Sequence, residues 1–269
     1  MSKISAVVSD VDGTLVTRDK RLTPATRDAV LALQRAGLKF TIVSSRPPRG
    51  MRALIEGLAL TDAIAGFNGG VVATPALATI EQHLIPPEAA HRAAEMLQQR
   101  GPDIWAFSGN DWLVRDAAAP LVDHERHTVG FEPTVVASLD AGLDAAAKIV
   151  GVSNDYDLLA RCERELQREL ADGASVARSQ LYYLDITHRL ANKGAALQAL
   201  ARALGVDPQE IATIGDGPND VAMFERSGLS IAMGNASAEV KARATQVTDS
   251  NEADGFAKAI DRFILRTRP

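Results

Sequence analysis

The sequence of 269 residues has a single cysteine, no long apolar run and no excess of basic charge. One cysteine excludes an internal disulfide. Cys162 lies among leucines at helical spacing, so we expect a buried thiol in a reducing cytoplasm. No apolar stretch reaches the roughly 20 residues that span a bilayer, and no signal-peptide pattern opens the sequence, so we expect no membrane partner. A formal charge of −5 argues against general nucleic-acid binding, although a local basic pocket stays open.

The composition, with 46% hydrophobic and 23% charged residues, is that of a globular protein, and the length suits one large domain or two ordinary ones. The first part of the chain alternates strand and helix patterns. Residues 4–9, 38–45 and 62–67 are apolar runs typical of buried strands, and residues 23–37 and 48–58 have helical patterns. This order predicts a parallel sheet with right-handed crossovers.

The same alternation returns near the end of the chain, with helices and strands expected at 193–205, 211–217, 219–228, 229–234 and 252–264. The middle of the chain reads instead as helices with hairpin strands, around an irregular region at 117–145. Such a mixture suggests an antiparallel sheet with helices on one face. We therefore expect an α/β core, residues 1–83 and 188–269, interrupted by an inserted α+β domain, residues 84–187.

Polar residues follow each predicted core strand. The ends of parallel strands share one rim of a sheet, and ligands bind there, so we expect these side chains to gather. Taken singly, each has a plainer explanation, such as a turn aspartate, a strand-end hydroxyl or a solvated surface lysine. Together, four carboxylates, a hydroxyl and a lysine favour a functional site. The residues are Asp10 and Asp12; Ser44, Ser45 and Arg46; Asn68; Asp216, Asn219 and Asp220; and Lys193, which opens the helix before the strand at 211–217.

Clustered carboxylates need a cation, and oxygen ligands beside a bound phosphate suit Mg²⁺. A calcium loop that starts at Asp10 fails on spacing, because Thr14, Leu15 and Arg21 occupy its ligand and glycine positions. Mg²⁺ with a lysine and a serine points to phosphate chemistry. In this interpretation Asp10 attacks a phosphoryl group, and Asp12 protonates the leaving oxygen and then deprotonates water.

Four motifs carry a resemblance to a known family. "DVDGT", Ser44 at the end of the second strand, "NKG" with Lys193 and "GDGPND" resemble, in order, the motifs of the haloacid dehalogenase superfamily of phosphatases. "SSRP" and "NGG" are similar to the "TGRP" and "NGA" of its Cof-type, class IIB branch. The resemblance implies a Rossmann-like parallel-sheet core with an inserted α+β cap. Ser45 in place of a common glycine, and Pro218, depart from the branch's pattern and bear on substrate fit.

The resemblance also implies roles. Asp10 would be the nucleophile and Asp12 the acid and base. Mg²⁺ would be held by Asp10, the backbone carbonyl of Asp12, and Asp216, with Asp220 and Asn219 on metal-bound waters or phosphate. The phosphate would contact Ser44, Lys193 and backbone N–H groups near Thr14 and Ser45.

The expected substrate is a small phosphorylated metabolite, with sugar phosphates favoured, and the expected assembly is a monomer or homodimer. Arg178 in the cap, with Arg46 at the core rim, is the predicted electrostatic contact to that substrate. Three alternatives stay open: a phosphomutase with the same carboxylates, a receiver-like phosphoacceptor, and a metabolite-binding protein without turnover. An isomeric phosphate in place of free phosphate would identify the mutase.

Overall fold

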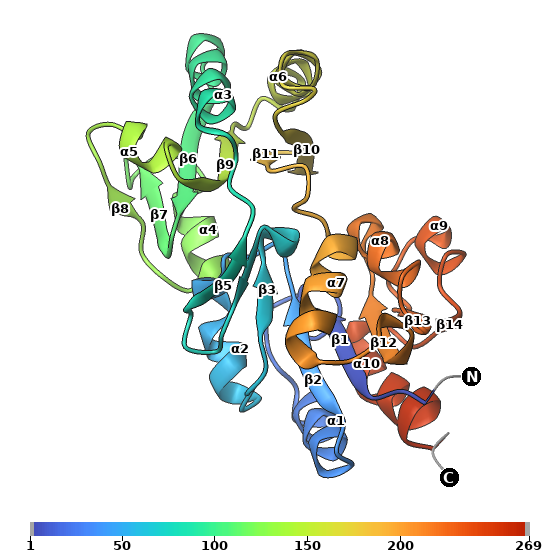
Figure 1. Cartoon of the computed structure of the whole chain (residues 1–269). Helices are drawn as coiled ribbons and strands as arrows, with labels where there is room; N and C mark the ends of the chain where they lie inside the picture. Colours follow the sequence, from blue (N-terminus) through green and yellow to red (C-terminus); the bar gives the residue numbers. More distant parts are fainter. Residues whose placement is uncertain (1–2, 267–269) are drawn as a thin grey trace. The chain divides into compact units, whose positions relative to one another are not determined.

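The computed structural model describes residues 3–266, which form two compact units (Figure 1). The core unit comprises the chain up to Glu81 and from Asn192 onward, and the inserted unit is Gln82–Ala191. The domain boundaries suggested by the sequence, at residues 84 and 187, remain a prediction about separately folding domains.

The core unit contains an eight-stranded sheet in the order β14-β13-β12-β1-β2-β3-β4-β5. Strands β14 to β3 pair in parallel, and β4 runs antiparallel to β3. This confirms the parallel sheet that the alternating pattern predicts. The strands are β1 (Ala6–Asp10), β2 (Lys39–Val43), β3 (Ile64–Gly66), β4 (Val71–Ala73), β5 (Thr79–Gln82), β12 (Ile211–Gly215), β13 (Leu229–Ala232) and β14 (Gln246–Val247).

Helices cover both faces of this sheet. On one face, α7 (Lys193–Leu204) and α8 (Val221–Phe224) pack on alternate residues of β1 and β2 such as Val8 and Val43. On the other face, Phe40 of β2 meets Phe256 of α10 (Gly255–Ala259) edge to face, and α10 contacts α1 (Pro24–Arg35). Two further short helices are α2 (Arg52–Gly57) and α9 (Ala238–Lys241). Because β1 is buried along its whole length, the sheet holds its end rigidly.

Local signals account for where α1 begins and ends. The side chain of Thr23 accepts a hydrogen bond from the Thr26 amide at 3.1 Å, and Pro24 occupies the first turn, where its missing N–H costs nothing. The helix ends at Arg35, just before Gly37, which has a φ of +73°. The predicted helix at 23–37 is confirmed.

Two parts of the core differ from the sequence-based expectation. Strands β4 and β5 extend the sheet beyond β3, although no strand was expected there. The closing helix at 252–264 is not one regular helix: it comprises a single 3₁₀ turn, α10, and a final π-helical segment, Ile260–Leu265.

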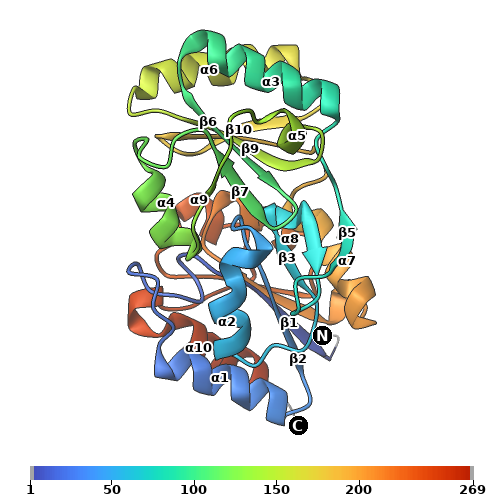
Figure 2. The same ribbon diagram turned by 90° about the vertical axis from the view of Figure 1, so that its left-hand side faces the viewer.

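The inserted unit has a six-stranded sheet in the order β10-β11-β9-β6-β7-β8. Helices α3 and α6 pack side by side on one face of it (Figure 2), around a core that includes Ile104, Ile149 and the buried thiol of Cys162. The opposite face carries Trp105, Trp112 and Tyr183 in edge-to-face contact. The elements are α3 (Pro87–Arg100), β6 (Asp103–Ser108), β7 (Asp111–Val114), α4 (Val122–Val129), β8 (Thr134–Val135), α5 (Asp140–Leu143), β9 (Ala146–Val152), α6 (Tyr156–Glu169), β10 (Ser175–Gln180) and β11 (Tyr183–Thr187).

The expected α+β character of the inserted unit is confirmed, but its irregular region is not irregular throughout. Residues 117–145 contain α4, α5 and β8, and β8 pairs with β7 in parallel, whereas all neighbouring pairs of this sheet are antiparallel. Over residues 3–266, no helix has both the length and the apolar character needed to cross a membrane.

Candidate functional site

The site lies at the carboxyl ends of the central strands of the core unit. Asp10 is the last residue of β1, Ser44 follows β2, and Asp216 follows β12. Strand β1 pairs in parallel with both β2 and β12, so the carboxyl ends of these three strands are neighbours in the sheet (Figure 1). Parallel pairing therefore brings together Asp10 and Asp216, which lie more than two hundred positions apart in the sequence.

Lys193 joins two carboxylates from separate parts of the chain. Its Nζ lies 2.5 Å from Asp10 Oδ1 and 2.6 Å from Asp220 Oδ1, and its side chain is 1% exposed. Asn192 caps α7, accepting a bond from the Ala195 amide at 2.9 Å, and this cap places Lys193 in the first helical turn. A buried lysine at a helix N-terminus is unfavourable without anions, and two aspartates supply them.

Asp216 lies beside the same group and is held by its neighbours. Its Oδ1 accepts a 2.9 Å bond from the hydroxyl of Thr14, and its Oδ2 accepts a 3.1 Å bond from the side-chain amide of Asn235. The Asn235 amide also donates to the carbonyl of Gly13. The sequence suggests that backbone amides near Thr14 bind phosphate, which stays a prediction; the structure adds that the hydroxyl of Thr14 orients Asp216. Asn235 was not anticipated, although it follows β13 as the other site residues follow their strands.

Gly13 is required by this geometry. Its φ is +81°, and a Cβ at this position would lie 2.3 Å from Asp216 Oδ2. No side chain fits between the turn and the carboxylate. The glycine of "DVDGT" thus permits both the turn and the close approach of Asp216.

Asp12 lies within the same turn but has different partners. Arg46 donates from Nε to Oδ2 at 2.7 Å and from Nη2 to Oδ1 at 2.6 Å, and Lys20 Nζ lies 2.7 Å from Oδ1. The carboxylate of Asp12 is not among the three acidic groups, those of Asp10, Asp216 and Asp220, that converge. Lys20 was missed at the level of sequence, where nothing distinguishes it from an ordinary loop lysine.

The remaining candidates have simpler surroundings. Ser44 is 1% exposed, and its Oγ accepts a bond from the Arg46 amide at 3.1 Å. Ser45 follows it and is half-buried. Asn219 is exposed and donates to the side chain of Asn68 at 3.0 Å. Arg178 lies in β10 of the inserted unit, where its guanidinium pairs with Glu163 of α6 at 2.9 Å.

Burial and charge shift several pKa values in this group. Burial, reinforced by the charge of Asp220, raises the pKa of Asp10 well above its ordinary value despite the opposing effect of Lys193. Burial also raises the pKa of Asp216, against the hydrogen bond from Thr14. Burial alone would lower the pKa of Lys193, but the charges of Asp10 and Asp220 raise it. The lysine is therefore charged, whereas burial disfavours the ionised forms of Asp10 and Asp216.

Asp12 shows the opposite behaviour. Burial would raise the pKa of Asp12, but the hydrogen bond and charge of Arg46, with those of Lys20, lower it below its ordinary value. Asp10 and Asp12, which are separated by a single residue, thus have pKa values shifted in opposite directions by their surroundings.

The three converging carboxylates fit a divalent cation. One oxygen each from Asp10, Asp216 and Asp220 lies within 4.8 Å of the others. When all three are ionised, the carboxylates and one lysine sum to a charge of −2, and all the ligand atoms are oxygens, which favours a hard ion such as Mg²⁺.

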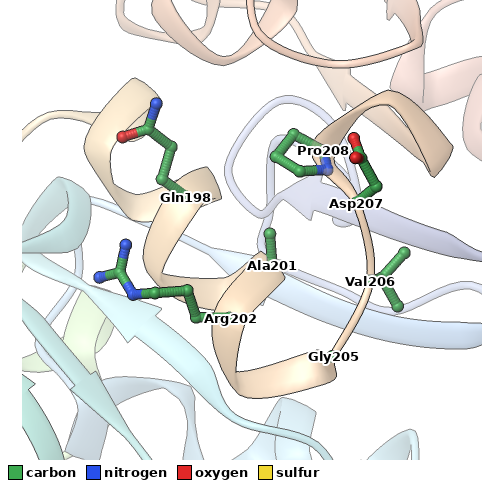
Figure 3. Close-up of a pocket in the computed structure, with 7 residues that line it drawn as sticks. All are labelled: Gln198, Ala201, Arg202, Gly205, Val206, Asp207 and Pro208. Atoms are coloured by element: carbon green, nitrogen blue, oxygen red, sulfur yellow. The ribbon is translucent and has the colours of Figure 1, made fainter.

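A separate depression of about 560 Å³ lies at the other end of α7 (Figure 3). It belongs to the C-terminal turn of the helix and the loop after it, whereas Lys193 is at the N-terminus, so it is not part of the carboxylate site. The lining residues are Gln198, Ala201, Arg202, Gly205, Val206, Asp207 and Pro208.

Comparisons with known proteins agree on one family. The model of the haloacid dehalogenase-like hydrolases matches residues 7–260. The chain is 27% identical over 288 residues to the 5-amino-6-(5-phospho-D-ribitylamino)uracil phosphatase YwtE of Bacillus subtilis, covering 97% of this chain and 98% of that protein. A solved haloacid dehalogenase-like hydrolase from Bacteroides thetaiotaomicron has a TM-score of 0.90 at 27% identity, covering 97% of this chain and 99% of the other. The subclass IIB sugar phosphatase BT4131 shares the fold, with a TM-score of 0.83 at 24% identity over 97% of this chain and 99% of the other.

Proposed function

We propose a mechanism for this chain from the family to which it belongs, the haloacid dehalogenase-like hydrolases, in which it is a phosphatase of the Cof type. In this proposal it is a Mg²⁺-dependent hydrolase of small phosphorylated metabolites, and it acts through an aspartyl-phosphate. One observation carries the proposal: the carboxylates of Asp10, Asp216 and Asp220 converge, and the buried ammonium of Lys193 pairs with two of them, Asp10 and Asp220. Such a group has anions for a metal and a cation for phosphate within the same few ångströms.

In this proposal Asp10 attacks phosphorus with one carboxylate oxygen. As the bond to the leaving oxygen breaks, Asp12 donates a proton to that oxygen. A water molecule then attacks phosphorus, Asp12 takes its proton, and the bond to Asp10 breaks to release phosphate. Asp10, Asp216 and the carbonyl of Asp12 would hold Mg²⁺, with Asp220 beside them, and the ion would neutralise charge on the phosphoryl group.

Phosphate oxygens would be bound by Lys193, Ser44 and backbone amides near Thr14 and Ser45. The Ser44 oxygen accepts a bond from the Arg46 amide, which orients the hydroxyl and leaves its hydrogen available to donate. Asn219 stands at the exposed rim, where it can reach phosphate or a metal-bound water. Donors fixed in advance stabilise the charge that develops in phosphoryl transfer.

For the substrate, we propose phosphate esters of sugars and sugar alcohols. The relative YwtE is named for a phosphorylated ribityl compound, which is a sugar-alcohol phosphate. Arg178 as a substrate contact stays a prediction, and its pairing with Glu163 means that it would have to exchange partners. A cytoplasmic location and a monomeric or homodimeric state are likewise predictions.

Phosphate release from a panel of sugar and polyol phosphates, with p-nitrophenyl phosphate as a generic ester, tests the proposal. Release is expected with Mg²⁺ and not with EDTA. An isomeric phosphate in place of free phosphate would assign a mutase. Activity that is unchanged by EDTA would contradict the proposed dependence on Mg²⁺. Failure to release phosphate from any of these esters would contradict the proposed phosphatase activity.

A further inference from the structure

The carboxylate of Asp12 is held by two cations from separate loops. The guanidinium of Arg46 binds it in a bidentate manner, with one hydrogen bond to each oxygen, and Lys20 donates a second bond to Oδ1. Oδ1 thus accepts two bonds and Oδ2 only one. Among the described residues no other group bonds to Oδ2, so this oxygen keeps a lone pair that can accept a proton.

Arg46 is placed by the same short segment that presents Ser44. Its amide donates to Ser44 Oγ at 3.1 Å, and its carbonyl accepts from the Phe67 amide at 2.9 Å. The side chain is 9% exposed, so the guanidinium is almost fully withdrawn from water. Because the backbone of Arg46 is held in place, its planar guanidinium restricts both the position and the plane of the carboxylate that it binds.

Lys20 reaches Asp12 from a tight loop with an unfavourable backbone. The Thr17 amide donates to the Arg21 carbonyl at 3.0 Å, and the Lys20 amide donates to the Thr17 carbonyl at 2.9 Å. This closes the loop with Lys20 at a φ of +63°, a left-handed conformation that a lysine rarely adopts. Backbone strain of this kind persists where the surrounding structure enforces it, often at functional sites.

The C-terminal part of the core unit enforces this loop. The side-chain amide of Asn251 donates to the Val16 carbonyl at 3.0 Å, and the Arg18 amide donates to Glu252 Oε1 at 2.6 Å. The loop is thus held by two hydrogen bonds to neighbouring residues, Asn251 and Glu252, and it places the Lys20 ammonium beside Asp12.

We propose that Arg46 and Lys20 are positioning residues for the second half of the reaction. They hold the Asp12 carboxylate so that Oδ2 takes the proton of the water that attacks the phosphorylated Asp10. In that step an oxygen–phosphorus bond to water forms, the bond from phosphorus to Asp10 breaks, and the water proton moves to Asp12. This role replaces the substrate contact that the sequence suggested for Arg46. It rests on the proposed function and deepens it.

The test uses 2,4-dinitrophenyl phosphate with the full chain and Mg²⁺. Its leaving group needs no proton, so phosphorylation of Asp10 proceeds without help from Asp12. We expect Arg46→Ala to lower kcat by on the order of 10²-fold and Lys20→Ala by on the order of 10-fold, within the range that general base catalysis contributes. The value of kcat/KM, which covers only the steps up to departure of the leaving group, should change by less than about threefold.

Two further signatures separate positioning from a merely structural role. Rapid mixing should show a burst of dinitrophenolate equal to the enzyme concentration in both variants, with phosphorylated protein visible by intact mass. Arg46→Lys should recover part of the lost kcat. Inhibition by inorganic phosphate should be unchanged, because the phosphate site itself is intact.

Arg21→Ala is the matched control, since Arg21 is the neighbour of Lys20 but pairs with the exposed Asp19 instead. Lys20→Gly removes the cation while relieving the left-handed backbone, so a loss of kcat with an unchanged or higher melting temperature excludes a folding defect.

A parallel fall in kcat/KM with weaker phosphate inhibition would show that Arg46 binds phosphate and would overturn the proposal. Unchanged kcat in both alanine variants would overturn it as well. Absence of turnover in the wild type with Mg²⁺ is a distinct result, and it refutes the proposed function.

Discussion

Among the three converging carboxylates of Asp10, Asp216 and Asp220, that of Asp220 has the fewest oxygen lone pairs left for a ligand. Its Oδ1 accepts from Lys193, and its Oδ2 accepts from the amides of Asp216 and Gly217 at 2.9 and 2.8 Å. This carboxylate therefore fixes the lysine and the loop that carries Asp216. Asp10 and Asp216 keep more capacity for a metal, and we expect them to contribute most of its affinity.

Replacing Asp10 with asparagine should abolish turnover while preserving the fold. The amide is not a nucleophile, and loss of a catalytic nucleophile typically costs on the order of 10⁴-fold or more in kcat. Hydrolysis of p-nitrophenyl phosphate measures this, and a thermal melt should show only a small change, because the asparagine amide oxygen can still accept a bond from Lys193 and Asp220 stays paired with that lysine. Asp28→Asn, at an exposed carboxylate of α1, is the control. Retained turnover in Asp10→Asn would assign the nucleophile elsewhere.

Gly13 and Gly37 form a natural pair for a second experiment. Both have positive φ, but an added Cβ meets Asp216 Oδ2 at 2.3 Å at Gly13 and nothing within 4 Å at Gly37. Each alanine variant should lose about 1 kcal/mol of unfolding free energy from backbone strain. Only Gly13→Ala should also lower kcat/KM, by roughly tenfold or more, because it displaces a side chain of the site.

Denaturant unfolding and steady-state kinetics measure the two quantities separately. Equal kinetic effects of the two substitutions would contradict the role assigned to Gly13.

At the scale of elements, the sequence predicts those whose signals are local. The helix after Thr23 has its cap, its proline and its glycine stop, and β1 and β12 are short apolar runs. Strand β5 was missed because its residues are mostly exposed and lack an apolar pattern. Helix α4 was missed because its polar sequence "VDHERHTV" buries only Val122 and Val129. Tertiary contacts, rather than periodicity, define these elements.

The same division holds within the site. Asp10, Lys193 and Asp216 follow from the rule that ligands gather beyond strand ends, and the structure brings them together. Lys20 could not be found in this way, because its loop has no periodicity and is held by residues more than two hundred positions later. The grip of Arg46 on Asp12 likewise depends on the relative placement of two strand ends.

The N-cap of α7 should affect both stability and catalysis. Asn192→Ala removes the bond to the Ala195 amide and should cost about 1 kcal/mol of unfolding free energy. Because Lys193 is the next residue, kcat/KM should fall several-fold as well. Asp155→Ala removes the equivalent cap of α6 in the inserted unit, where the side chain accepts from the Leu158 amide at 2.8 Å. It should cost similar stability and leave p-nitrophenyl phosphate hydrolysis unchanged.

Unfolding curves and initial rates on the same preparations test this prediction. A cap variant of α7 with reduced stability and full activity would show that Lys193 is positioned by its two aspartates alone.

At the scale of the whole molecule, stability should depend on divalent metal and on pH together. The pKa of Asp216 is raised above its ordinary value of 3.8 by burial. Between pH 3.8 and that raised pKa, the metal-free folded state therefore holds a proton that the unfolded chain has released. The cost of ionising Asp216 is absent below pH 3.8 and grows as the pH rises through the raised pKa.

Asp216→Asn should accordingly stabilise the metal-free protein, by more at pH 8 than at pH 5. In the wild type, Mg²⁺ at 100 times its dissociation constant should add about 2.7 kcal/mol of stability, and the variant should lose most of this gain. Melting temperatures in EDTA and in MgCl₂ at the two pH values measure both effects. An Mg²⁺ gain equal in wild type and variant would place the ion elsewhere.

The position of β1 in the middle of the sheet has a consequence for biosynthesis. Its partner β2 leaves the ribosome soon afterwards, but its other partner, β12, is translated only after the entire inserted unit. At translation rates of 5–20 residues per second this delay is on the order of ten seconds or more. During it, one edge of a strand that is buried along its whole length in the folded core lacks its hydrogen-bonding partner, which is the condition that invites aberrant pairing between nascent chains. We expect shielding of that edge by ribosome-associated chaperones to influence the yield of folded enzyme.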